Sequence, residues 1–147
     1  MSIPIGKMIT VGLLPSPLKR AYYRMKGARI GKGVKFGLLS VITAREIEIG
    51  DDTRIGPLSF ISVRKLKLGK RVRIHSTVAV DTNELSVDDD SAIMEQVVVG
   101  GMLTPRSRLV IGKRVKIFPY SFLNPTEPIT IDDDAGIGGA NYIFTHG

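Results

Sequence analysis

The fold is decided by the stretch 49-IGDDTRIGPLSFI-61, in which one short pattern occurs twice. An aliphatic residue recurs every six positions, glycine follows each of the first two, and a small or β-branched residue lies four positions after each. The stretch 68-LGKRVRIHSTVAV-80 has the same spacing. Six is a multiple of the two-residue strand period but does not fit the helix period of about 3.6 residues. The pattern therefore predicts short strands separated by tight turns.

The same spacing extends through most of the chain and divides it into coils of three six-residue units. Groups of three aliphatic residues begin at positions 49, 68, 87, 111 and 131, and a less complete group begins at position 30. The step from 87 to 111 is 24 residues, against 19 or 20 for the others, which predicts a loop around residues 98–108. The fifteen repeat positions are all Ile, Leu or Val: Ile49, Ile55, Ile61, Leu68, Ile74, Val80, Val87, Ile93, Val99, Ile111, Ile117, Leu123, Ile131, Ile137 and Ile143.

A three-sided coil of parallel strands accounts for this repeat. Each aliphatic side chain would point inward and stack on its equivalent one coil away, about 4.8 Å along the axis. One coil cannot bury its own apolar face, so several coils must stack around one core. We therefore predict an all-β fold, with a parallel β-helix domain at residues 30–147 and an N-terminal segment at residues 1–29.

Charged residues alternate in sign at the corner after the first aliphatic residue of each coil. The second position after it is occupied in turn by Lys32, Asp51, Lys70, Asp89, Lys113 and Asp133, and the third by Gly33, Asp52, Arg71, Asp90, Arg114 and Asp134. If the coils stack in register, each charge lies between opposite charges. We expect these residues to fix the register between coils and to keep the protein soluble. For the same reason we assign the acidic triplets 88–90 and 132–134 to corners rather than to calcium sites.

Composition narrows the classes of function. The chain has 147 residues, 43% of them hydrophobic, which suits one globular domain. It has no cysteine, which excludes disulfides, thiolate metal sites and a cysteine nucleophile, and a cytoplasmic location is expected. The net charge of +7 favours an anionic partner such as a phosphate-bearing cofactor or an acidic membrane surface. Aromatic residues make up only 6% and are not interleaved with the basic residues, so we expect no nucleic-acid partner.

The N-terminal segment breaks the repeat and predicts one short helix over residues 15–27. Ser16 suits the N-cap, Pro17 the first helical position and Gly27 the stop. Two roles remain open for this helix. It can cap the exposed core of the first coil, or it can contact a membrane surface together with residues 1–14 through its basic side chains. Those basic residues are Lys19, Arg20, Arg24 and Lys26.

The repeats resemble those of the hexapeptide-repeat acyltransferases over about residues 30–147. This resemblance implies a left-handed parallel β-helix and a homotrimer. The C-terminal half is similar to the galactoside, maltose and xenobiotic O-acetyltransferase branch, and the similarity is carried by 124-NPTEPITIDDD-134 and 137-IGGANYIFTHG-147. By this match His146 takes the place of the catalytic histidine and Asn124 that of an active-site, substrate-binding asparagine. Gly147 departs from the pattern, because several relatives have proline there.

The resemblance implies an acyl-CoA-dependent O-acyltransferase that moves an acetyl group from acetyl-CoA to a hydroxyl of a sugar or polysaccharide precursor, without a metal. His146 would remove the hydroxyl proton, since imidazole changes protonation near neutral pH. Two other functions remain open: a non-catalytic β-helical scaffold or assembly module, and an N-acyltransferase that acts on the amine of a nucleotide sugar. Coils that bind coenzyme A in the family would follow His146, so we expect a truncated domain that is too short to be active alone.

Overall fold

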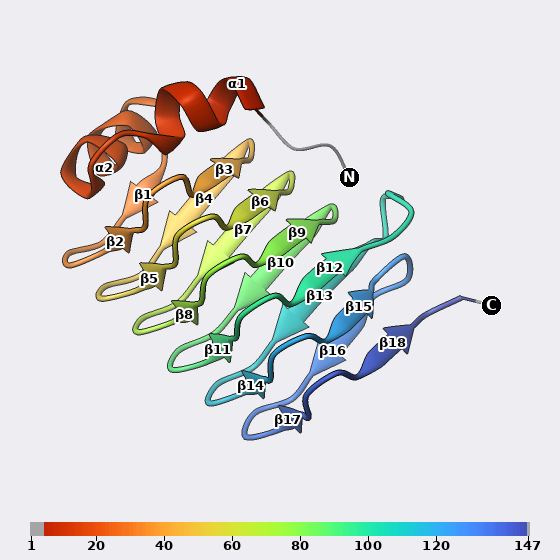
Figure 1. Cartoon of the computed structure of the whole chain (residues 1–147). Helices are drawn as coiled ribbons and strands as arrows, with labels where there is room; N and C mark the ends of the chain where they lie inside the picture. Colours follow the sequence, from red (N-terminus) through yellow and green to blue (C-terminus); the bar gives the residue numbers. More distant parts are fainter. Residues whose placement is uncertain (1–4, 147) are drawn as a thin grey trace.

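A computed structural model describes residues 5–146 of the chain. Residues 1–4, where the predicted N-terminal segment begins, and Gly147, where the β-helix prediction ends, lie outside the described residues. The described residues begin with a helical cap and then wind through six coils, with the cap lying over the first coil (Figure 1). The cap contains α1 (Ile5–Lys7), the π-helical turn η1 (Met8–Gly12) and α2 (Ser16–Met25).

Within residues 5–146, eighteen short strands form three parallel sheets of six strands each, which are the three sides of the coil. Sheet A contains β1 (Arg29–Ile30), β4 (Glu46–Ile49), β7 (Lys65–Leu68), β10 (Glu84–Val87), β13 (Arg108–Ile111) and β16 (Ile129–Ile131). Sheet B contains β2 (Lys35–Phe36), β5 (Arg54–Ile55), β8 (Arg73–Ile74), β11 (Ala92–Ile93), β14 (Lys116–Ile117) and β17 (Gly136–Ile137). Sheet C contains β3 (Val41–Thr43), β6 (Phe60–Ser62), β9 (Ala79–Asp81), β12 (Val98–Gly100), β15 (Phe122–Asn124) and β18 (Tyr142–Phe144). The predicted parallel β-helix with a short N-terminal helix is confirmed.

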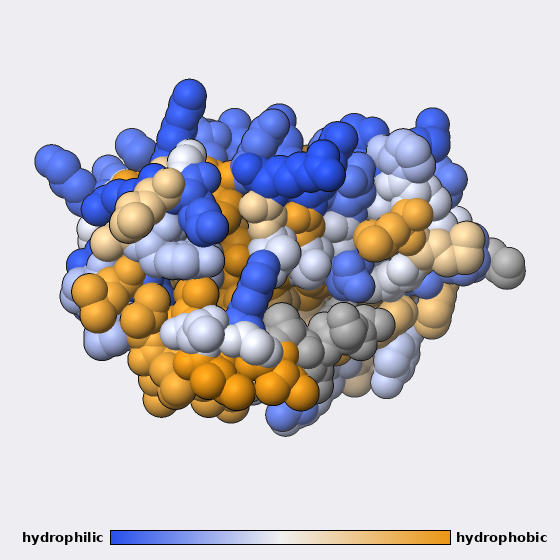
Figure 2. Space-filling model, turned by 90° about the horizontal axis from the view of Figure 1, so that it is seen from above, coloured by the Kyte–Doolittle hydropathy of each residue, from blue (hydrophilic) through white to orange (hydrophobic). Residues whose placement is uncertain are grey.

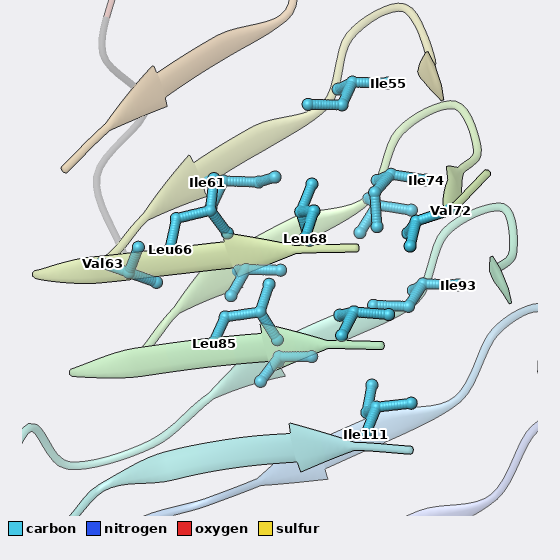
Figure 3. Close-up of a cluster of buried hydrophobic side chains, with 14 of the residues drawn as sticks. Ile55, Ile61, Val63, Leu66, Leu68, Val72, Ile74, Leu85, Ile93 and Ile111 are labelled. Atoms are coloured by element: carbon cyan, nitrogen blue, oxygen red, sulfur yellow. The ribbon is translucent and has the colours of Figure 1, made fainter. Parts of the chain in front are cut away.

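The repeat positions stack in the register that the spacing predicts. In sheet B, for example, Ile74 pairs with Ile93, which in turn pairs with Ile117. Figure 3 shows Ile74 and Ile93 among the aliphatic side chains gathered inside the coil. Of the fifteen repeat residues, all are buried except Ile137 and Ile143, which are half-buried because no described coil packs beyond the sixth. The core is therefore a continuous set of aliphatic columns along the axis.

Sheet A buries a second column that the six-residue spacing did not predict. Its longer strands place an extra inward residue two positions before the repeat position. The members of this column are the half-buried Ile47 and the buried Leu66, Leu85, Leu109 and Ile129. A regular coil therefore needs 19 residues rather than 18, because one side of the prism is longer than the other two.

The alternating corner charges make two different kinds of contact. At the third corner position, Arg71 donates two hydrogen bonds to Asp90 at 2.6 and 3.0 Å, and Arg114 does the same to Asp134. At the second position, the aspartates accept instead from backbone N–H groups, as Asp89 does from Lys70 at 2.8 Å. The ladders therefore hold neighbouring coils in register, as expected, although at the second position the carboxylate binds the backbone rather than the lysine side chain.

The basic residues of α2 cap the open carbonyl groups of the first coil. Lys19 donates to the carbonyl oxygen of Gly37 at 2.7 Å, Arg20 to that of Val34 at 2.8 Å, and Arg24 to that of Ile30 at 2.9 Å. These bonds satisfy acceptors that have no preceding strand to pair with. The capping role predicted for the helix is therefore supported by direct contacts.

Ser16 does not act as the predicted N-cap. It is the first residue of α2, Pro15 occupies the cap position, and no side chain bonds to the helix end there. The hydroxyl of Ser16 instead accepts a hydrogen bond from the N–H of Phe36 at 3.0 Å. That N–H lies at the edge of the first coil, so Ser16 caps the β-helix rather than the α-helix.

The outer side of the cap is apolar. Ile5, Ile9 and Leu13 recur every four residues and are 54–64% exposed, and Figure 2, which looks onto the capped end, shows apolar side chains gathered on one margin and hydrophilic ones on the other. Within residues 5–146, no helix has the length and apolar character needed to cross a membrane. Contact of this segment with a membrane surface stays a prediction.

Replacing Lys19 with methionine is expected to change how stability depends on pH. Lys19 is fully buried, and burial lowers its pKa from 10.5 to about 8. Between these two values the unfolded chain holds a proton that the folded chain has lost, so the free energy of unfolding rises with pH. Between about pH 7.5 and about pH 9.5 the wild-type protein should gain about 2 kcal/mol relative to Lys19→Met. Urea unfolding of both proteins at the two pH values measures this gain, and an unchanged difference would contradict it.

Candidate functional site

The coil brings Asn124 and His146 to neighbouring rungs of one corner. Asn124 ends β15 and pairs in register with Phe144 of β18, two residues before His146. The hydroxyl of Thr145 donates to the carbonyl oxygen of Asn124 at 2.8 Å and accepts from the N–H of Glu127 at 3.0 Å. The backbone next to His146 is therefore fixed against the coil that carries Asn124.

The side chain of Asn124 is buried and oriented by a short chain of hydrogen bonds. The N–H of Met102 donates to the hydroxyl of Thr126 at 3.0 Å. That hydroxyl donates in turn to Oδ1 of Asn124 at 2.6 Å. The carboxamide oxygen thus has a partner, which leaves Nδ2 as the group of Asn124 that can donate to a ligand.

The predicted long loop covers this asparagine. It connects β12 to β13 and lies against the corner of the next coil, where a side chain at Gly101 would collide with Oδ1 of Asn124. Arg106 in the same loop forms an ion pair with Glu127 at 2.8 Å. At the loop tip, Met102 is 61% exposed. The extra residues of the fourth coil therefore build one wall of the corner that holds Asn124.

His146 is exposed at the end of the described chain. Within residues 5–146 its ring makes no hydrogen bond, so no carboxylate or carbonyl group of these residues fixes its tautomer. The two predicted site residues thus differ in environment: Asn124 is held in a buried network, whereas the imidazole is open to solvent.

His75, which the repeat places at a corner facing solvent, is half-buried and has an acidic partner. Its Nδ1 lies 2.7 Å from Oε1 of Glu95 on the next coil. The pKa of Glu95 is lowered, first because the carboxylate accepts a hydrogen bond from its own backbone N–H and second because it pairs with His75. The pair could not be predicted from the repeat, because Glu95 lies twenty residues away and one position off the rung of His75.

The described part of the chain contains no group of three or more His, Asp or Glu side chains placed to hold a metal ion. The acidic triplets lie at corners, where Asp90 and Asp134 pair with arginines and Asp133 accepts from the N–H of Lys113 at 2.7 Å. The expected corner role of these residues is therefore supported by their contacts.

Comparison of the chain with protein-family models, with curated proteins and with solved structures finds no match.

Proposed function

We propose that the protein is an acyl-CoA-dependent O-acyltransferase that transfers an acetyl group to a hydroxyl of a sugar or polysaccharide precursor. One observation carries the proposal. The three-sided parallel coil places His146 one rung from Asn124, and the hydroxyl of Thr145 ties the two rungs together. The resemblance of the repeats to those of hexapeptide-repeat acyltransferases implies the roles of these two residues, a catalytic histidine and a substrate-binding asparagine.

In the proposed reaction His146 is the general base. Its imidazole accepts the proton of the acceptor hydroxyl while the hydroxyl oxygen bonds to the thioester carbonyl carbon. The carbon–sulfur bond then breaks, and the thiolate of coenzyme A leaves with the proton from the imidazolium. The exposure of His146 supports this role, because the ring is open to two substrates that arrive from solvent.

Asn124 is proposed to bind the acceptor or to stabilise the oxyanion of the tetrahedral intermediate through Nδ2. A fixed donor stabilises developing charge more than a mobile one, because it does not have to reorganise during the reaction. The hydrogen bond from Thr126 to Oδ1 supports this role, since it restrains the carboxamide before substrate binds. The reaction needs no metal. We also propose a homotrimer, in which a neighbouring copy would complete the site.

A screen with radiolabelled acetyl-CoA tests the proposal. The purified full-length gene product is incubated with matched sugars that differ at one carbon by hydroxyl or amine, in free and nucleotide-linked form. We expect label on the hydroxyl sugars. Label confined to the amines of nucleotide sugars would replace the proposal with N-acyl transfer. No label on any acceptor, from protein shown by circular dichroism to be folded, would favour a non-catalytic scaffold.

A further inference from the structure

The outward face of sheet B carries three cations in register on the first three coils. Lys35 of β2 pairs with Arg54 of β5, and Arg54 pairs with Arg73 of β8. Neighbouring strands are about 4.8 Å apart, so the three side chains start from a row about 10 Å long that runs along the coil axis. We call these three residues the cation row.

The cation row breaks the rule that governs charge elsewhere on the sheets. Sheet A alternates strictly, with the register series Glu46, Lys65, Glu84 and Arg108. Like charges directly opposite one another on paired strands oppose pairing. Among the strand-paired positions of residues 5–146, the cation row is the one run of three like charges. The repulsion within the cation row destabilises the fold, whereas the charges on sheet A are paired with opposite charges. This difference suggests that a ligand neutralises the cation row.

The cation row lies along a groove with a volume of about 520 Å³. Gly37 and Gly56 form part of its floor and add no side chain to fill it. A side chain at Gly56 would collide with the backbone of His75 on the next coil, so the floor there is required to be bare. The groove is therefore a permanent feature of the packed coils rather than a gap that a longer side chain could occupy.

No free carboxylate faces the cations within the described lining of the groove. Its one acidic residue, Glu95, is paired with His75 at 2.7 Å. Just outside the groove, Asp90 accepts two hydrogen bonds from Arg71. Arg73 donates from Nη1 to the carbonyl oxygens of Asp52 and Val72 at 2.5 and 3.3 Å, which fixes its guanidinium and leaves the N–H groups of Nε and Nη2 available.

We propose that this groove binds the phosphate chain of a ligand that carries two or more linked phosphates. Arginine guanidinium groups match phosphate oxygens in pairs, and the length of the row suits successive phosphates better than a single one. Phe36, the one Phe, Tyr or Trp residue in the lining, is buried, so its ring offers no face for stacking a nucleotide base. The cation row lies on coils 1–3, away from His146 on the sixth coil, and this binding goes beyond the proposed acyl transfer.

Thermal unfolding at constant ionic strength tests the site, with sodium tripolyphosphate as the probe and orthophosphate at equal charge as the comparison. We expect tripolyphosphate to raise the Tm of the wild-type protein by about 3–5 °C and orthophosphate by less than about 1 °C. Arg54→Gln should lose most of this shift. Without any phosphate, Arg54→Gln should itself unfold about 1–2 °C higher than the wild type, because the repulsion is relieved.

Lys116→Gln is the matched control, because Lys116 has the same outward position in sheet B but pairs with Ala92 and Gly136. It should keep the full tripolyphosphate shift, and Lys35→Gln, a second variant of the row, should weaken it. Equal shifts in Arg54→Gln and Lys116→Gln, or equal shifts with the two phosphates, would overturn the proposal. A third measurement with ATP separates the possible sources of the phosphate chain. A Tm shift with ATP no larger than that with tripolyphosphate supports recognition of the phosphate chain alone. A Tm shift with ATP and none with tripolyphosphate overturns the proposal.

Discussion

Replacing Ile93 with alanine is expected to lower the free energy of unfolding by about 2–5 kcal/mol. Ile93 is fully buried in sheet B between Ile74 and Ile117 of the neighbouring coils. Removing its three outer carbons loses their transfer from water and leaves a cavity, because the columns above and below are held by the strand ladders and cannot collapse into the space. The measurement is urea unfolding followed by circular dichroism, with the m-value checked against that of the wild type.

Ile143→Ala is the matched control for this change. Ile143 occupies the equivalent inward position of sheet C but lies half-exposed in the sixth coil. Its truncation should cost less than about half as much, since part of the side chain is already in water. Equal losses at the two positions would contradict a core in which stacked coils bury the aliphatic columns.

The repeat predicted the coil because one physical requirement fixes both spacing and residue type. An inward column favours branched aliphatic residues, and the interior beside it favours small ones, such as Val72, Ser91 and Val97, all of which are buried. Each coil applies this requirement again, so the pattern is visible in a single sequence. The greater length of sheet A could not be predicted. Its second column adds inward residues but leaves the spacing of the repeat positions unchanged.

The candidate site could be predicted only in part. The order of Asn124 and His146 along the repeat placed them on neighbouring rungs, and the register of β15 and β18 agrees. The network around Asn124 could not be predicted, because it depends on how the loop at Gly101 folds back onto the next coil. The capping contacts of Lys19 could not be predicted either. A basic residue on a short helix does not indicate which backbone carbonyl group it will bind in the first coil.

His146→Ala is expected to lower kcat for acetyl transfer by about 10²–10⁴-fold and to leave KM for the acceptor nearly unchanged, the usual loss for a general base. Tyr142→Phe, on the exposed strand of the same coil, is the control and should keep the wild-type rate.

The most direct measurement of the central claim is therefore the initial rate of label transfer from acetyl-CoA to a hydroxyl acceptor, compared among the wild type, His146→Ala and Tyr142→Phe. The proposed mechanism predicts a loss of at least about 100-fold that is confined to His146→Ala, in a protein whose unfolding midpoint is unchanged. Equal rates for the wild type and His146→Ala would contradict the assignment of His146 as the general base.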